Sequence, residues 1–333
     1  MKCRVLKDRE LMKMLVITAV VFILMTALRP GLFLTANNFT SMGYQIPELG
    51  LYTLAMTIAM LSGGIDLSII GIGNLCSIVC AYILHFALVQ EYSGGMLVLF
   101  VFLGIFAAVL VGLFCGLING IVIAYGKIKP MLATMATQSI FIGIAIIITE
   151  GKPVSKVPDT FTYFGTHTFL KLPLPLWLLL IVLLAAAFLL NKTKLGFEIR
   201  FLGSNLKASL YTGMNVKWIQ MKTYMLSGLI CAVCGIEILS RTNSAKADYA
   251  STYLFQALLA AVLGATNPNG GSAKISCLAL ALVSLQFLSS GFNMLRLGGY
   301  FKEFTWGLLL IFVLSLTSIS SYVRNKKGKR AKG

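Results

Sequence analysis

The sequence predicts an all-α, polytopic membrane protein: a bundle of about ten transmembrane helices with both termini in the cytoplasm. Hydrophobic residues make up 58% of the 333 residues and charged residues only 12%, whereas charged residues supply about 25% of an ordinary soluble domain. The apolar runs are about twenty residues long, as helices that cross a membrane require, and do not alternate as barrel strands do. We therefore expect one transmembrane domain over residues 1–333, with its membrane-spanning part at 13–321.

The first half of the chain contains five apolar runs. The expected spans cover residues 14–34, 46–62, 67–89, 96–124 and 131–149. Arg29-Pro30-Gly31 interrupts the first span near its far end, because proline breaks helical hydrogen bonding. The polar residues 35–45 predict a loop, Gln90 to Gly95 a turn, and Gly126 to Pro130 a short basic connection.

The second half contains five further runs with longer connections. The expected spans cover residues 172–190, 218–240, 253–265, 275–292 and 300–321. Residues 150–171 predict a polar loop, 191–217 a charged cytoplasmic segment, and 241–252 a second polar stretch. The run at 253–265 is barely long enough to cross the hydrocarbon core, so it could equally be a re-entrant or broken helix. Residues 322–333 form a basic tail.

The distribution of basic residues predicts the orientation. With ten spans, 20 of the 28 Lys and Arg residues fall on the side of the two termini and 8 on the other, and positive loops face the cytoplasm. The net charge of +17 therefore indicates contact with an anionic lipid surface through residues 2–13 and the tail. It does not indicate a nucleic-acid partner.

One short polar segment, Ser62-Gly63-Gly64-Ile65-Asp66-Leu67-Ser68, separates the second and third spans. A carboxylate placed in hydrocarbon costs roughly 2.5–3.5 kcal/mol on insertion scales, so Asp66 needs polar surroundings. Two interpretations stay open. Asp66 caps the following helix in a turn at the membrane surface, or it lines or hinges a transport pathway.

Glycine-rich interruptions occur once in each half of the chain, at residues 62–73 and 264–271. Paired breaks in apolar segments often mark the route of a transported solute. The two breaks follow different spans within their halves, so the pattern is only approximate.

Sequence motifs for covalent chemistry are missing. The chain has no G-x-x-x-x-G-K-[ST] phosphate loop, no H-E-x-x-H and no G-x-S-x-G. Cys231 and Cys234 have C-x-x-C spacing, but they lie in the middle of an apolar run, where small packing residues are the better interpretation. We expect no enzymatic activity, no cofactor and no metal.

The charged segment 191–217 predicts an amphipathic element. If residues 197–211 are helical, one face would carry Phe197, Phe201, Leu206 and Leu210. Gly203-Ser204-Asn205 would end a first short helix or cap a second. Such an element either lies on the membrane surface or docks into a soluble partner.

Five motifs in order resemble the permease subunit of ATP-binding-cassette sugar importers of the ribose, xylose and autoinducer-2 type. They are Ser62 to Ser68, Gly116-Leu-Ile-Asn119-Gly120, Lys129-Pro130 with Thr134 and Gly143, Gly196 to Asn205, and Ala260 to Gly264 with Gly270-Gly271. The resemblance covers residues 45 to 320. Ile70, Ala265 and residues 267–269 depart from the family pattern, which leaves the sugar and the pairing of subunits open.

The resemblance implies a non-catalytic permease in a prokaryotic cell membrane that moves a simple sugar by alternating access. Its partners would be ATPase subunits, an extracellular sugar-binding protein, and a second permease copy or a paralogue. The translocation path or its hinge would involve Gly63, Gly64, Asp66, Ser68, Asn119 and Thr134. Coupling to the ATPase would involve Gly196, Arg200, Gly203, Asn205 and Ala208. The alternative is an ion-coupled secondary transporter that uses Asp66 as its proton or sodium site.

Overall fold

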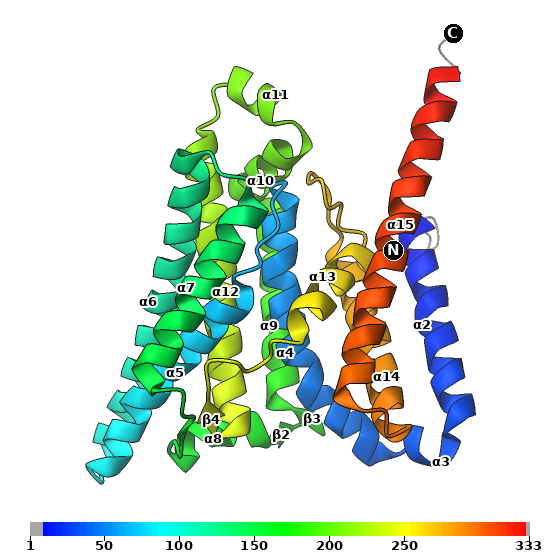
Figure 1. Ribbon diagram of the computed structural model, residues 1–333. Coiled ribbons are helices and arrows are strands. Elements are labelled where there is room, and N and C mark those ends of the chain that lie inside the picture. Colours follow the sequence, from blue (N-terminus) through cyan, green and yellow to red (C-terminus); the bar gives the residue numbers. More distant parts are fainter. Residues whose placement is uncertain (1–8, 331–333) are drawn as a thin grey trace.

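The computed structural model describes residues 9–330 and consists mainly of helices (Figure 1). The predicted basic segments at 2–13 and 322–333 therefore lie partly outside the described residues. In the first half the helices are α2 (Arg9–Leu28), α3 (Pro30–Phe33), α4 (Ala36–Leu61), α5 (Ile69–Val89), α6 (Gly94–Gly126) and α7 (Pro130–Thr149). In the second half they are α8 (Asp159–Thr166), α9 (Leu174–Lys192), α10 (Lys194–Ser204), α11 (Leu206–Tyr211), α12 (Val216–Thr242), α13 (Tyr253–Leu263), α14 (Ile275–Met294) and α15 (Gly299–Arg330).

Seven helices of the described part are long and apolar enough to cross a membrane: α2, α5, α6, α7, α9, α12 and α14. The predicted class, a polytopic helical membrane protein, is therefore confirmed. Helix α13 has 11 residues, which at 1.5 Å per residue gives a length of roughly 16 Å. It is too short to cross a hydrocarbon core of about 30 Å by itself.

Helix α12 lies at the centre of the bundle and packs against α4, α5 and α6. Glycines allow the close approach of α6: a Cβ at Gly112 would lie 2.5 Å from the Gly228 oxygen, and one at Gly120 would lie 2.6 Å from the Met221 Cα. Such small-residue contacts bring helix backbones together in membranes, where the hydrophobic effect gives no drive for helix association.

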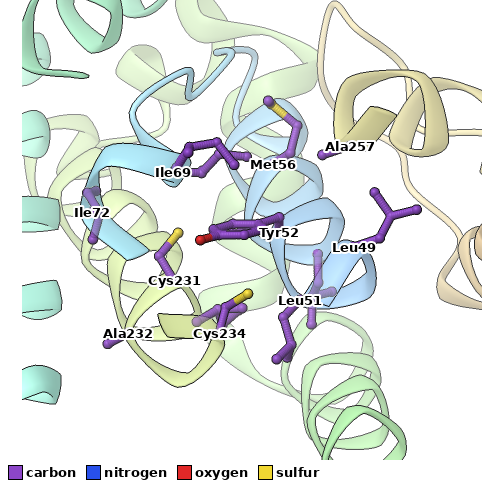
Figure 2. Close-up of a cluster of buried hydrophobic side chains, with 14 of the residues drawn as sticks. Leu49, Leu51, Tyr52, Met56, Ile69, Ile72, Cys231, Ala232, Cys234 and Ala257 are labelled. Carbon is purple, nitrogen blue, oxygen red and sulfur yellow. The ribbon is translucent and has the colours of Figure 1, made fainter. Parts of the chain in front are cut away.

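The largest buried cluster surrounds α4 (Figure 2). Tyr52 is fully buried, and Figure 2 shows its hydroxyl pointing toward the side of α12 that carries Cys231. A Cβ at Gly73 would lie 2.9 Å from the Tyr52 Cε1 atom. The Tyr52 ring fits here because residue 73 has no side chain. Cys231 and Cys234 are both buried in the same cluster.

The prediction of a loop at residues 35–45 is wrong, because α4 begins at Ala36. Thr35 caps the helix by accepting a hydrogen bond from the Asn38 backbone nitrogen at 3.3 Å. The polar side chains that suggested a loop have partners on α14: the Ser290 hydroxyl lies 2.6 Å from Asn38 Oδ1. Gln286 likewise donates to Gln45 Oε1 at 3.0 Å. These hydrogen bonds to α14 allow the polar residues at the beginning of α4 to be helical.

The predicted polar connection at 150–171 contains short ordered elements. Strand β1 (Val154–Ser155) pairs in antiparallel fashion with β4 (Ser244–Ala245), and β2 (Thr168–Phe169) pairs with β3 (Leu172–Pro173). Figure 1 shows α3, α8 and these strands at one end of the bundle. The beginning of α2, the end of α15, and α10 with α11 lie toward the other end.

Candidate functional site

The turn between α4 and α5 contains two glycines that disfavour side chains for different reasons. Gly63 has φ +88°, which side chains rarely adopt. A Cβ at Gly64 would meet the Tyr224 hydroxyl and lie 2.8 Å from the Pro130 Cβ. The turn is therefore pressed against α12 and the beginning of α7.

Asp66 is completely buried at this turn. Its Oδ1 accepts hydrogen bonds from the Ser68 backbone nitrogen at 3.0 Å and from the Ser68 hydroxyl at 2.6 Å. Its Oδ2 accepts a third hydrogen bond, from the Ser227 hydroxyl of α12 at 2.7 Å. These donors provide the polar surroundings that a buried carboxylate requires.

The hydrogen bonds continue from Ser68 into α6 and α7. Asn119 Nδ2 donates to the Ser68 hydroxyl at 2.7 Å, and the Thr137 hydroxyl donates to Asn119 Oδ1 at 2.6 Å. Asp66, Ser68, Asn119, Thr137 and Ser227 therefore form one chain of hydrogen bonds, which we call the Asp66 network. It joins the turn to three helices.

Thr134 holds the same turn from α7. Its hydroxyl donates to the Ile65 oxygen at 3.0 Å and accepts from the Leu67 backbone nitrogen at 3.0 Å. All the residues predicted for the translocation path thus lie on or beside one turn. Sequence reasoning missed Ser227 and Thr137, because a single hydroxyl in an apolar helix carries no local signal.

The structure does not show Asp66 as a helix cap. Helix α5 begins at Ile69 with Ser68 as its N-cap, and no side chain caps it by a hydrogen bond; Asp66 bonds the Ser68 nitrogen within the turn that precedes the helix. The bond to Ser227 joins segments far apart in the sequence, which a local cap does not require. The carboxylate is fully enclosed by protein, so in this conformation it does not line an open channel.

The predicted coupling segment forms two short helices with the expected break. Thr193 caps α10 by accepting from the Gly196 nitrogen at 3.3 Å, and Asn205 caps α11 by accepting from the Ala208 nitrogen at 3.0 Å. The break at Asn205 is confirmed. Gly196 permits a tight turn after α9, since its Cβ would lie 2.5 Å from the Leu190 Cα.

The aromatic face predicted for this segment points away from the bundle. Phe197 is 60% exposed, and its ring stacks on Phe201 at a centroid distance of 5.8 Å. Leu206 and Leu210 are also exposed, and α10 instead buries Ile199. Arg200, next to the stacked pair, donates to Asn191 Oδ1 at 2.6 Å. The segment therefore offers an apolar surface with basic residues around it.

Glycines from three separate segments meet where α10 ends. A Cβ at Gly270 would lie 2.8 Å from both the Gly203 Cα and the Gly63 Cα. The Gly271 nitrogen donates to the Leu61 oxygen at 3.0 Å. We call Gly63, Gly203, Gly270 and Gly271 the glycine junction. It brings both glycine-rich interruptions into backbone contact with the predicted coupling segment.

The loop that carries Gly270 is closed by its own hydrogen bonds. The Asn267 nitrogen donates to the Ser272 oxygen at 3.0 Å, and the Asn269 nitrogen donates to Asn267 Oδ1 at 3.0 Å. The sequence 267–269, which departs from the family pattern, therefore builds a compact turn that presents Gly270 to α10.

A buried ion pair that sequence reasoning did not identify joins α4 to α12 far from the glycine junction. Arg241 Nε donates to Glu48 Oε1 at 2.6 Å, and the guanidinium also donates to the Tyr249 hydroxyl at 3.1 Å. Glu48 is fully buried and Glu237 almost so.

No group of three or more His, Cys, Asp or Glu residues in the described part could hold a metal ion.

Comparison with known proteins identifies the family. Residues 38–314 match the family described as "Branched-chain amino acid transport system / permease component". The ribose import permease protein RbsC of Escherichia coli K12 is 29% identical over 317 residues, 94% of each chain. RbsC of Bacillus subtilis 168 is 30% identical over 299 residues, 89% of each chain.

A third relative is the autoinducer 2 import system permease protein LsrD of Escherichia coli O9:H4. It is 31% identical over 278 residues, 82% of this chain and 81% of the relative. No solved structure matches this chain. The chain therefore belongs to the family of transport-system permease components, as a multi-pass, non-catalytic subunit of an ATP-binding-cassette importer in the bacterial inner membrane.

Proposed function

We propose that this chain forms the translocation path for a simple sugar or a sugar-like solute, moved by alternating access that partner ATPase subunits drive. The relatives named for ribose and autoinducer 2 import support this substrate class. The observation that carries the mechanism is the glycine junction, where the coupling segment contacts both glycine-rich loops through backbone atoms.

The proposed membrane arrangement has ten crossing segments and both termini in the cytoplasm. Besides the seven long apolar helices, α4, α13 and α15 would complete the set, with α13 crossing together with the irregular chain on either side of it. The excess of Lys and Arg on the side of the termini supports this orientation. The same orientation places α10 and α11 in the cytoplasm.

The coupling segment would dock on the ATPase through its exposed aromatic face. Phe197 and Phe201 provide an apolar contact surface, and aromatic residues contribute strongly to protein interfaces. Gly196, Arg200, Asn205 and Ala208 set the path of α10 and α11 beneath that face. When ATP binding draws the ATPase subunits together, α10 would shift as a rigid body and carry the Gly203 end with it.

The Asp66 network would then transmit this shift from the turn before α5 to α6, α7 and α12. Because Asp66 accepts three hydrogen bonds from serine donors, its geometry suits a rigid connection between helices. The alternative, an ion-coupled transporter that uses Asp66, gains no support from the comparisons, whose family consists of permease components of transport systems.

The full importer would contain further subunits. A second copy of this chain or a paralogue would complete the path, and an extracellular sugar-binding protein would deliver cargo to the end of the bundle that carries α8 and the strands. Basic residues near both termini would contact anionic lipid at the cytoplasmic surface.

Reconstitution tests this proposal. The chain is purified with its co-expressed ATPase and incorporated in liposomes, with the binding protein on the outside and ATP inside, and uptake of labelled D-ribose, D-xylose and D-galactose is measured. We expect accumulation of at least one sugar that needs ATP and is insensitive to an uncoupler. Accumulation by the chain alone, driven only by an ion gradient, would contradict the proposal.

A further inference from the structure

A groove of about 450 Å³ lies between α13 and α15. Figure 1 shows α13 at middle height of the bundle beside α15, and the two helices pack together. The groove is lined by Ser251, Thr252, Phe255, Glu303, Trp306, Gly307, Leu310 and Ile311. Its volume lies within the range of about 300–1,000 Å³ that is typical of small-molecule sites.

The polar groups of the groove have no partners within the described protein. The hydroxyls of Ser251 and Thr252 and the carboxylate of Glu303 are exposed, and none of them forms a side-chain hydrogen bond or ion pair with another described residue. Thr252 precedes α13 but does not cap it with its side chain. These groups are thus free to bond a solute.

The remaining wall of the groove is aromatic and aliphatic. Phe255 is 56% exposed and lines the groove. Trp306 also lines it but is almost fully buried, with its ring centroid 5.8 Å from that of Phe292. Hydroxyl and carboxylate groups beside an aromatic surface match the chemistry of a monosaccharide, which has hydroxyls around its rim and C–H groups on its faces. Few convergent polar groups in a mainly apolar wall are typical of ligand sites.

The position of the groove fits a transport path better than a lipid-facing surface. Helix α13 is short, and irregular chain precedes and follows it. Irregular backbone at membrane depth is tolerated where it is buried in protein or lines a water-filled cavity. Glu303 lies near the start of α15, four residues after Gly299, and its exposed carboxylate adds a charged group that a wall facing lipid would not favour.

We infer that this groove is a transient binding site for the transported monosaccharide, with Ser251, Thr252 and Glu303 bonding its hydroxyls and Phe255 contacting its ring. This inference rests on the proposed function, since it places a binding site along the same translocation path. The groove is open and its polar groups are few, so binding is weak enough for the sugar to leave.

The test uses the reconstituted complex of the full chain with its ATPase and binding protein. Ser251→Cys is introduced together with Cys3→Ser, because the six other cysteines are buried. We expect a membrane-impermeant, charged thiol reagent to block uptake of whichever of D-ribose, D-xylose or D-galactose the wild type accumulates. That sugar, present in excess, is expected to slow the labelling at least several-fold.

Two further variants complete the design. Thr168→Cys is the matched control, since Thr168 is exposed in β2 at the end of the bundle that carries α8 and does not line the groove; its labelling should not respond to sugar. Glu303→Gln should reduce uptake about tenfold while the complex still hydrolyses ATP.

Three results separate the outcomes. Unchanged uptake in Glu303→Gln, or labelling of Ser251→Cys without protection by sugar, would overturn the groove site and leave the proposed function intact. Oxidative cross-linking of two Ser251→Cys chains without sugar protection would assign the groove to contact between copies, and would also overturn it. Absence of ATP-dependent uptake of all three sugars by the wild type would overturn the proposed function, and the groove site with it.

Discussion

Replacement of Gly203 by alanine tests the glycine junction directly. A Cβ at this position would meet the Leu61 carbonyl oxygen and would lie 2.6 Å from the Gly271 nitrogen and 3.0 Å from the Leu61 carbonyl carbon. All three are backbone atoms, so no side chain can rotate away to make room. Either α10 must move, or the end of α4 at Leu61 and the loop that contains Gly271 must move.

The expected cost follows from these contacts. Overpacking of a well-filled site costs about 1–3 kcal/mol. Loss of the hydrogen bond between the Gly271 nitrogen and the Leu61 oxygen adds about 1 kcal/mol. We therefore expect Gly203→Ala to lower the free energy of unfolding by roughly 2–4 kcal/mol. Because α10 would no longer move together with both loops, more ATP should be hydrolysed for each sugar taken up.

Thermal unfolding of the purified complex measures the first effect, and simultaneous uptake and ATPase assays in liposomes measure the second. Gly143→Ala is the matched control: it makes the same change in α7, where a Cβ meets nothing within 4 Å, and should stabilise the helix by about 0.5–1 kcal/mol. If Gly203→Ala kept wild-type stability and the wild-type ratio of ATP to sugar, the junction would have no role in coupling.

Three other predictions concern separate parts of the molecule. Asp66→Asn replaces one acceptor oxygen of the Asp66 network by an amide nitrogen, which cannot accept the serine hydrogen bonds, and should lower uptake while the protein is still inserted and expressed; unchanged uptake would remove Asp66 from the mechanism. Phe197→Ser should weaken co-purification of the ATPase by tenfold or more without loss of thermal stability, because the ring is exposed, and normal co-purification would argue against docking there. Arg241→Met should destabilise the protein by about 3–5 kcal/mol, because it leaves the buried Glu48 carboxylate unpaired. The double variant with Glu48→Gln should recover most of that loss in a thermal unfolding assay, and a lack of recovery would show that the ion pair is not the cause.

Much of the fold could be predicted from local sequence. Apolar runs located the helices that became α5, α6, α7 and α9 to within a few residues, because a span must be apolar over the thickness of the membrane. The cap at Asn205 was also predictable, since a capping side chain bonds only to its own backbone neighbours. The start of α4 was not, because the polar side chain of Asn38 depends on a partner in α14 for its hydrogen bond.

The candidate site was predicted only in part. Motif resemblance selected Asp66, Ser68 and Asn119, which the structure joins by hydrogen bonds. It could not select Ser227 or Arg241, because these residues act through partners in helices distant in sequence. The groove beside Glu303 could not be predicted from the sequence either, since α13 and α15 form its wall together.

By itself, the sequence determined the membrane class, the order of the helical segments and the family, because hydrophobic run length and short motifs are properties of neighbouring residues. Only the tertiary structure decided that the two glycine-rich loops meet each other at the end of α10. That meeting depends on how closely helices from both halves of the chain can pack, and glycine at Gly63, Gly203 and Gly270 permits it by leaving room for backbone against backbone.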